Sequence, residues 1–392
     1  MIELIIDKKQ NVETICLVEN GKLIEKYQDD ENTKKNRLEG NIYAGKVSDV
    51  IPGMQSAFVD YGDSRKGLLH LKDAIPQVDV KNAKIETKKI TDVIKPNQKV
   101  LVQIKKDSND KKGAKVSTHI SIPSKYVVFM PNTDIITISQ KINNKERIKE
   151  LLDLAKENLS KSDGIVIRTS AEMANNEEIT KDIKRCINKW NEIKQNYEKC
   201  NETKLIYYAD NVQSKILIDL KVDKVITNNK EEFENLKKII QVEEIKGVKL
   251  EFSPKKDLLE MYDLKLQINK AKNRKVWLNC GGFITIDRTE ALTAIDVNTG
   301  KYTGKSDVEN TVFKVNKEAT IEIAKQLRLH DIGGIVIIDY IDMHNTANNE
   351  KIEELLKEEL KKDRAKTQVE GFTKLNLMEM TRKHICSHLD EN

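Results

Sequence analysis

The chain contains little cysteine, which limits the kinds of covalent or metal support available to it. Its 392 residues include five cysteines: Cys16, Cys186, Cys200, Cys280 and Cys386. An odd number without a CxxC pair argues against a disulfide framework and against a zinc ribbon. Cys386 lies near His384 and His388, but we interpret this stretch as a frayed tail and not as part of a metal site. We therefore expect no bound zinc.

The sequence also lacks any hydrophobic run long enough to span a bilayer. Residues 1–7 contain neither a basic region nor the apolar core of a signal peptide, so we expect a cytoplasmic protein without a membrane partner. Charged residues make up 33% of the chain, yet the net charge is only +5. This balance predicts local basic faces and not a uniformly basic surface. The hydrophobic content of 38% is sufficient for the cores of two or three domains.

Two stretches come close to a nucleotide-binding P-loop, and neither completes the motif. Residues 40–47 end in Val47 where the motif needs the Ser or Thr that binds magnesium. A strand-like run follows where a helix N-terminus would be needed. Residues 300–306 are one residue too short for the motif. We reject nucleotide binding at both stretches.

The most informative stretch runs from residue 280 to residue 343. Apolar alternation typical of a strand stops at Asp296, where a glycine-closed loop follows. Capping-box spacing at residues 306–309 then predicts the start of a helix. A second apolar run fits a strand buried on both faces and ends at Asp339. Strand, helix and strand form a crossover unit, which would bring Asp296 and Asp339 side by side at one sheet edge.

Two neighbouring carboxylates repel each other, so they stay ionised only when a cation or a basic group lies between them. Magnesium takes one or two protein carboxylates, keeps several waters and binds phosphate oxygens with its remaining positions. Asn298, two residues after Asp296, could hold a phosphate oxygen or a metal-bound water. The alternative is that these are solvated residues at strand ends. Spacing alone does not decide between the two interpretations.

Three motifs in this stretch resemble, almost residue for residue, the catalytic subdomain of the ribonuclease E/G family. They are Thr-Glu-Ala-Leu-Thr-Ala-Ile-Asp-Val-Asn at 289–298, residues 324–334, and Val-Ile-Ile-Asp-Tyr-Ile-Asp-Met at 336–343. The resemblance implies that Asp296 and Asp339 bind magnesium, with manganese as an alternative, and are catalytic together with Asn298. It also implies a single-stranded RNA substrate and a homodimer, here one without a zinc link.

Residues 37–121 show short alternating strands separated by Gly and Pro turns, which predicts a small barrel. Aromatic and basic residues occur together within residues 57–70. Exposed aromatic rings stack on unpaired bases for ~1–3 kcal/mol each, and lysines follow the phosphates. The stretch resembles the OB-fold RNA-binding module of the same family. The predicted RNA-binding residues are Phe58, Leu68 and Lys112, from the resemblance, and Tyr61. The alternative for both aromatics is a place in the core.

A buried strand at residues 164–167 ends on Arg168 and Thr169, just before a helical stretch at 172–198. An arginine fork, a hydroxyl and a helix N-terminus together make a phosphate pocket. The resemblance implies that the pocket grips the 5′-monophosphate end of RNA. The residues assigned to it are Arg168, Thr169, Val128 and Lys366. Lys366 stands where the family often has arginine, so it keeps the charge and loses the bidentate geometry.

The predicted fold class is therefore α/β and multidomain. The resemblance implies an RNase-H-like subdomain without nuclease activity at 1–36 plus 204–279, with first strands at 205–208 and 215–218. It further implies an OB-fold domain at 37–121, a 5′-sensor subdomain at 122–203 and a DNase-I-like catalytic subdomain at 280–392.

The predicted function is a magnesium-dependent, single-strand-specific endoribonuclease of RNA processing and decay, acting in rRNA maturation and mRNA turnover. It would favour 5′-monophosphate RNA and leave 5′-phosphate and 3′-hydroxyl ends. One alternative is a non-catalytic RNA-binding or ribosome-maturation factor with the same fold. Another is a metal-dependent phosphodiesterase that acts on DNA.

Overall fold

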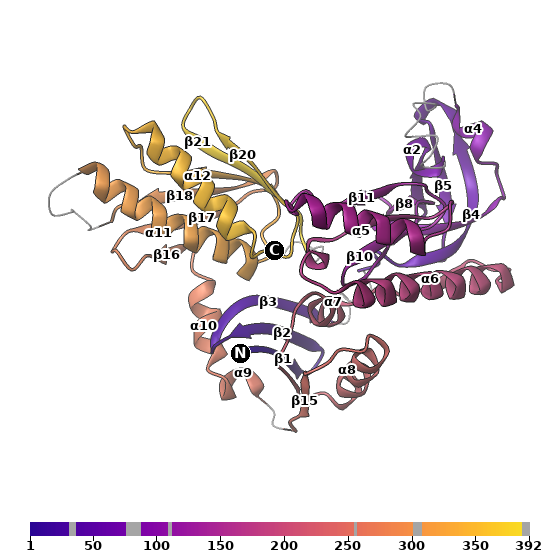
Figure 1. The fold of residues 1–392 in the computed structure, drawn as a ribbon, viewed down its shortest axis with the longest axis horizontal. Helices are drawn as coiled ribbons and strands as arrows, with labels where there is room; N and C mark the ends of the chain where they lie inside the picture. Colours follow the sequence, from indigo (N-terminus) through magenta and orange to yellow (C-terminus); the bar gives the residue numbers. More distant parts are fainter. Residues whose placement is uncertain (31–36, 76–87, 109–111, 255–256, 301–307, 386–392) are drawn as a thin grey trace. The chain divides into compact units, whose positions relative to one another are not determined.

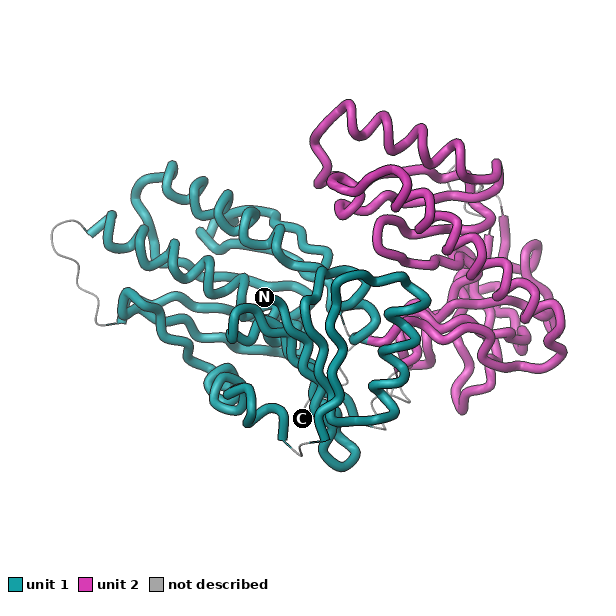
Figure 2. The backbone as a smooth tube through the Cα atoms, turned by 60° about the horizontal axis from the view of Figure 1, so that its bottom comes forward, with its two compact units in different colours: residues 1–31, 212–392 teal, residues 32–211 magenta. Residues whose placement is uncertain are grey.

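The structure is a computed structural model that describes residues 1–30, 37–75, 88–108, 112–254, 257–300 and 308–385. It is a mixed α/β fold that includes a closed five-stranded barrel (Figure 1). The chain forms two compact units, which Figure 2 colours separately. One unit comprises Met1–Glu31 with Val212–Asn392, and the other comprises Asn32–Asn211. The four smaller subdomain boundaries stay predictions.

The barrel of the second unit confirms the predicted run of short strands. Its order is β4-β5-β6-β8-β7, and a β4–β7 pairing closes it. The strands are β4 (Ile42–Ile51), β5 (Ser56–Asp60), β6 (Gly67–His70), β7 (Lys99–Lys106) and β8 (Lys115–Ser117). Short helices η1 (Pro52–Met54), α2 (Leu71–Ala74) and α4 (Ile90–Val93) connect or flank them. The first near-P-loop leads into β4, which is extended where a P-loop would need a helix N-terminus.

The rest of the second unit is a small sheet covered by two helices. The sheet has the order β11-β12-β10-β9. Its strands are β9 (Ile122–Pro123), β10 (Val127–Met130), β11 (Ile136–Ile138) and β12 (Gly164–Ile167). The helical elements are α5 (Lys145–Asn158), η2 (Thr169–Ala171) and α6 (Asn176–Lys199). Phe129, Ile165 and Ile167 share a buried cluster with residues of both long helices.

The first unit contains a five-stranded sheet of order β15-β14-β1-β2-β3. The strands are β1 (Ile2–Lys9), β2 (Val12–Glu19), β3 (Lys22–Asp30), β14 (Lys224–Thr227) and β15 (Lys249–Phe252). The helices are α7 (Val212–Asp219), α8 (Lys230–Val242), α9 (Leu258–Met261) and α10 (Leu264–Ala271). Asn20 and Gly21 have φ of 49° and 77°, as a tight turn between β2 and β3 requires. β1 pairs in parallel with β14, so the N-terminal strands share a sheet with a distant segment.

One of the two strands predicted for this sheet forms in another sheet, and the other is wrong. Residues 205–208 do form most of a strand, β13 (Lys204–Tyr207), but it pairs with β4 of the barrel. Residues 215–218 lie inside helix α7. Six of the eight residues of α7 are buried, and such a short, largely buried apolar run cannot be assigned to strand or helix from periodicity.

The second sheet of the first unit carries the two candidate aspartates. Its order is β16-β17-β18-β19-β21-β20. The strands are β16 (Lys275–Trp277), β17 (Phe283–Arg288), β18 (Leu292–Asn298), β19 (Gly334–Asp339), β20 (Thr367–Phe372) and β21 (Leu377–Arg382). Helices α11 (Val308–Leu329) and α12 (Thr346–Leu360) lie along the sheet in Figure 1 and share its core. As predicted, α11 links two parallel neighbours, β18 and β19.

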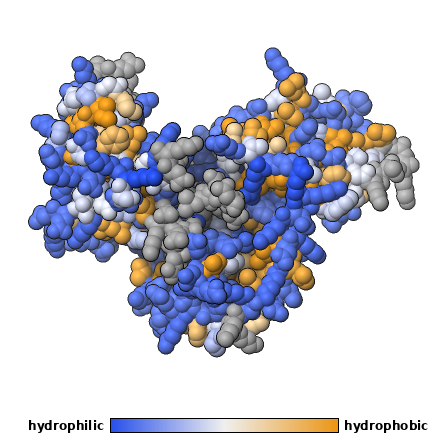
Figure 3. Space-filling view, turned by 180° about the vertical axis from the view of Figure 1, so that it is seen from behind, coloured by the Kyte–Doolittle hydropathy of each residue, from blue (hydrophilic) through white to orange (hydrophobic). Residues whose placement is uncertain are grey.

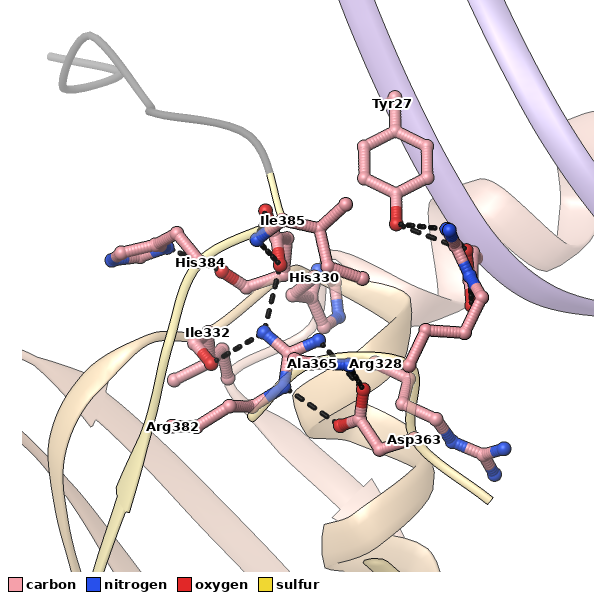
Figure 4. Close-up of polar contacts among 12 residues, drawn as sticks. Tyr27, Arg328, His330, Ile332, Asp363, Ala365, Arg382, His384 and Ile385 are labelled. Atoms are coloured by element: carbon pink, nitrogen blue, oxygen red, sulfur yellow. Dashed lines mark hydrogen bonds and ion pairs between the residues drawn. The ribbon is translucent and has the colours of Figure 1, made fainter. Parts of the chain in front are cut away.

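A buried ionic network lies at the end of β21 (Figure 4). The Arg382 guanidinium donates to Asp331 and Asp363 at 2.7 Å each and to the carbonyl oxygen of Ile332 at 2.9 Å. The side chains of all three charged residues are 0% exposed. Nearby, Arg364 pairs with Glu25 of β3 at 2.6 Å, so a second buried ion pair ties β3 to the segment before β20. These contacts tie together the ends of α11, β20 and β21 in addition to the apolar packing around them.

The long described helices are amphipathic, with a buried stripe and a charged outer face. None of them combines the length and the hydrophobicity needed to cross a membrane. The longest, α6, has 24 residues, but its buried residues follow one stripe among many charged side chains. On the face seen in Figure 3, hydrophilic residues separate the hydrophobic ones into smaller patches.

Candidate active site and RNA-binding surfaces

The pairing of β18 with β19 brings the two predicted aspartates together. Asp296 and Asp339 are direct partners in the parallel register, so their side chains leave the same face of the sheet. Neighbouring strands lie about 4.8 Å apart, which sets the spacing of the two side-chain roots. Thr293, Ile295 and Val297 alternate with Asp296 and are buried on the helix-covered face. Both aspartates are exposed on the opposite face.

The electrostatics of this pair favour a bound cation. Desolvation is the main factor that raises the pKa of Asp339 above its ordinary value, followed by the negative charges of Asp296 and Asp342. The Asn298 amide donates a hydrogen bond to the carboxylate of Asp296. Within the described ranges, no group of three or more His, Cys, Asp or Glu side chains could hold a metal. The pair therefore supplies two hard oxygen ligands, which suits an ion that keeps several waters.

Asn316 holds the segment that follows Asp339, and sequence reasoning missed it. Its side chain is fully buried on α11. It donates to the carbonyl oxygen of Ile341 at 2.8 Å and accepts from the Ile341 amide at 3.2 Å. The signal that could have revealed it is an amide on the apolar stripe of α11, where a polar group needs a partner. One residue further on, Asp342 accepts a hydrogen bond of 2.7 Å from Asn376.

Glu309 fixes the next part of the same segment. Its carboxylate accepts from the backbone amides of His344 and Asn345 at 3.0 and 3.1 Å, and these bonds lower its pKa. We predicted instead that Glu309 would complete a capping box with Ser306. Ser306 lies outside the described residues, and the Glu309 carboxylate points to a different loop. The contact orders residues that follow β19, and local sequence spacing does not reveal it.

Two glycines allow the loops around Asn298 to approach closely. A Cβ on Gly282 would lie 2.8 Å from the carbonyl oxygen of Asn298. Gly300 has φ of +60°, and a Cβ there would lie 2.5 Å from the carbonyl oxygen of Gly281. Both distances are shorter than a real Cβ contact tolerates, so larger residues would displace the backbone. The position of Asn298 next to Asp296 therefore depends on these glycines.

The barrel surface brings together three of the four predicted RNA-binding residues. Phe58 on β5 and Leu68 on β6 are direct cross-strand partners, and both are half-buried. The Leu68 amide donates to the carbonyl oxygen of Ala114 at 2.8 Å, two residues after the exposed Lys112. Lys115, the partner of Leu68 on β8, is also exposed. An apolar pair beside two lysines is a surface suited to a base and a phosphate backbone.

The prediction that Tyr61 binds RNA is wrong. Its side chain is 1% exposed and packs edge to face against Tyr43, with the ring centroids 5.2 Å apart. Its hydroxyl donates to Asp63 at 3.0 Å. Because the ring has no free face, it cannot stack on a base, and we assign Tyr61 to the barrel core.

The predicted 5′-phosphate residues of the second unit share one region of the small sheet. Val128 pairs with Val166 across β10 and β12, and Arg168 follows on the same face. Arg168 donates to the carbonyl oxygen of Ser124 at 2.5 Å. The hydroxyls of Thr169 and Ser139 lie 2.8 Å apart. Lys366, also assigned to this pocket, is exposed just before β20 in the other unit, so its role there stays a prediction.

The predicted helix N-terminus does not contribute to this pocket. α6 begins at Asn176, four residues later than expected, because η2 occupies residues 169–171. The Asn175 side chain caps α6, and Glu177 and Glu178 occupy its first turn. Two negative charges at that end would repel a phosphate. Arg147, which sequence reasoning missed, donates to the carbonyl oxygens of Ala171 and Glu172 at 3.1 Å each and so orders the intervening loop.

Comparisons with known proteins agree on one family. The Ribonuclease E/G family matches residues 121–385. The chain is 32% identical to Ribonuclease G of Escherichia coli (strain K12) over 390 residues, which covers 97% of this chain and 79% of that protein. It is 34% identical to Ribonuclease G of Haemophilus influenzae over 398 residues, covering 99% and 81%. It is 33% identical to Ribonuclease E of Buchnera aphidicola over 404 residues, covering 100% and 41%.

Proposed function

Because the chain belongs to the ribonuclease E/G family, we infer that it is a magnesium-dependent endoribonuclease specific for single strands. As a member of this family it is a hydrolase that acts on RNA in RNA processing. The proposed magnesium dependence rests on one observation: Asp296 and Asp339 are direct neighbours on the paired strands β18 and β19. We propose rRNA maturation and mRNA turnover as its processes, and products that carry 5′-phosphate and 3′-hydroxyl ends.

The same family membership supports finer fold assignments. We propose that the closed barrel is an OB fold that binds unpaired RNA through Phe58, Leu68 and Lys112. The sheet built on β1 and β14 would be an RNase-H-like subdomain without nuclease activity. The sheet that carries Asp296 and Asp339 would be a DNase-I-like catalytic subdomain.

Several residues around the Asp296–Asp339 pair would have distinct roles in hydrolysis. A magnesium ion at this site would supply a Lewis acid for the scissile phosphate and a water of lowered pKa as the nucleophile. Asp296 and Asp339 would hold the ion, and Asn298 orients Asp296 through the hydrogen bond from its amide. Asn316 and Glu309 hold the backbone after Asp339, so the carboxylate pair keeps its geometry without relying on the ion.

Cleavage should require a divalent cation and should not require the 2′-hydroxyl at the cut. The reason is that an activated water is the nucleophile, so the neighbouring hydroxyl has no necessary part. We expect purified protein with magnesium to cut both an all-RNA oligomer and one with a single 2′-deoxy nucleotide at the cut position. Chelator should stop both reactions. A matched DNA oligomer serves as control, since its cleavage would support the DNA-directed alternative, and absolute dependence on the 2′-hydroxyl would contradict the mechanism.

Arg168, Thr169 and Val128 would form the pocket for a 5′-monophosphate end, whereas Lys366, which lies in the other unit, stays a prediction. We expect the unaltered protein to cleave a 5′-monophosphate RNA faster than the same RNA with a 5′-hydroxyl. Arg168→Ala should remove this preference, about tenfold or more, because a charge-assisted hydrogen bond contributes roughly 1.5–3 kcal/mol. Lys194→Ala, which removes an exposed positive charge from α6, is the matched control. Equal cleavage of both RNAs by the unaltered protein would refute the pocket.

A further inference from the structure

The face of the sheet that carries Asp296 also carries an aromatic pair on the next two strands, β17 and β16. Phe283 on β17 is the direct partner of Asn298 on one side and of Trp277 on the other. In the next row, Thr285 pairs with Asp296 and with Lys275. Direct partners point to the same face, so both rows lie on the face opposite α11 and α12.

The two rings form an ordered surface outside the core. Trp277 is 58% exposed, and its ring meets the Phe283 ring edge to face with centroids 5.3 Å apart. Neither ring is part of the buried core of this sheet, whereas Val276, between Lys275 and Trp277, packs against that core. The alternation of β16 therefore directs the larger ring outward and the smaller side chain inward.

A cation and a glycine complete the surface. The Lys275 ammonium lies 4.2 Å from the centroid of Trp277 and 3.4 Å from that of Phe283. A Cβ on Gly300 would lie 3.4 Å from Phe283 and 3.5 Å from Trp277. The rings therefore rest on the loop that follows the Asp296 strand, and a positive charge accompanies them. An exposed indole with a neighbouring ammonium matches a nucleotide, which offers a flat base and a negative phosphate.

We propose that Trp277, supported by Phe283 and Lys275, stacks an unpaired base of the RNA close to the scissile phosphate. The proposal rests on the proposed function, because it takes Asp296 and Asp339 as the place of cleavage. Two strand spacings separate β18 from β16, about 10 Å, a span that one or two nucleotides can cover. Stacking accepts every base, so the subsite would help to align the chain for cleavage without imposing a sequence.

The test measures binding separately from cleavage. The parent protein carries Asp296→Asn and Asp339→Asn, so it binds RNA without cutting it. In this parent, Trp277→Ala should weaken binding of a short single-stranded RNA roughly 5- to 100-fold, and Trp277→Phe should restore most of the loss. Leu266→Ala on α10 is the matched control, since Leu266 is a 68% exposed apolar residue of the same unit on a different element.

An abasic scan identifies the stacked base. Removing a single base at one position should weaken binding to the parent by a similar factor and should not weaken binding to the Trp277→Ala variant further. The chain has two tryptophans, Trp277 and Trp190. A Trp190→Phe variant therefore has Trp277 as its single tryptophan. In this variant, intact RNA should quench the fluorescence of Trp277, and the abasic RNA should not.

The outcomes separate the two proposals. The stacking subsite is refuted if Trp277→Ala binds RNA as tightly as the parent does. It is also refuted if removing a base weakens RNA binding equally in the parent and in Trp277→Ala. Either result holds even when the unaltered protein cleaves RNA. If Trp277→Ala weakens RNA binding as expected but the unaltered protein never cleaves RNA, the stacking subsite is supported and the proposed nuclease activity is refuted.

Discussion

Asp339→Asn is expected to slow RNA cleavage by on the order of a thousandfold or more while leaving single-stranded RNA bound. A bound divalent ion contributes several kcal/mol of transition-state stabilisation, and each 1.36 kcal/mol corresponds to a tenfold change in rate. The amide retains the shape of the carboxylate and loses the charge that would hold the ion. Asp296→Asn should act in the same way, and the double variant should be little worse than either single one, because both residues would hold the same ion.

The measurement pairs single-turnover cleavage with equilibrium binding of the same RNA. Glu379→Gln is the matched control. Glu379 on β21 is an exposed carboxylate and the register partner of Ile337 on β19, so it lies on the same face of the sheet as Asp339. It should change neither rate nor affinity. If the Asp339 variant behaved like this control, the protein would be an RNA-binding or ribosome-maturation factor with a nuclease fold.

The loss of activity should not come from loss of folding. Partial desolvation and the charges of Asp296 and Asp342 raise the pKa of Asp339, so the folded state binds this proton more tightly than the unfolded state does. Without metal, the ionised side chain therefore opposes folding once the pH rises above the unfolded value near 3.8. In chelator at neutral pH, Asp339→Asn should unfold at a higher temperature than the unaltered protein. The difference should disappear as the pH falls toward 3.8.

The juxtaposition of Asp296 and Asp339 could be predicted from the sequence because their positions depend on local features. Both aspartates end apolar runs, and a helix of adequate length joins the runs, so a parallel crossover brings their ends together. Asn316 could not be predicted in this way. Its partner is the backbone of Ile341, and only the packed position of α11 brings the two together. Contacts that depend on three-dimensional packing leave little trace in residue spacing.

The errors have a similar physical cause. Tyr61 and Phe58 both stand among short barrel strands, and composition does not distinguish the inward ring from the outward one. The start of α6 was missed because Asn175, and not the preceding Glu172, supplies the cap. Residues 215–218 were assigned to a strand because a short apolar run satisfies either structure. In each case the residue types fit more than one structure, and tertiary packing decides which structure forms.

Arg382→Met is expected to be among the most destabilising single substitutions in the first unit. It would leave Asp331 and Asp363 buried at 0% side-chain exposure without their 2.7 Å partner. Removing one member of a buried ion pair costs about 3–5 kcal/mol, because the remaining charges stay desolvated. Denaturant unfolding should therefore show a lower midpoint for this variant, with loss of cleavage only where the protein is unfolded.

The control and a rescue make this prediction specific. Lys361→Met removes a cation from an ion pair with Glu358 whose side chains are 59% and 64% exposed, so the change in unfolding free energy should be small by comparison. Adding Asp363→Asn to Arg382→Met should recover part of the loss, because one uncompensated charge disappears. Equal stability of the Arg382 and Lys361 variants would contradict the view that this network fixes the ends of β20 and β21. The sheet that carries Asp296 and Asp339 would then owe its stability to the apolar core it shares with α11 and α12.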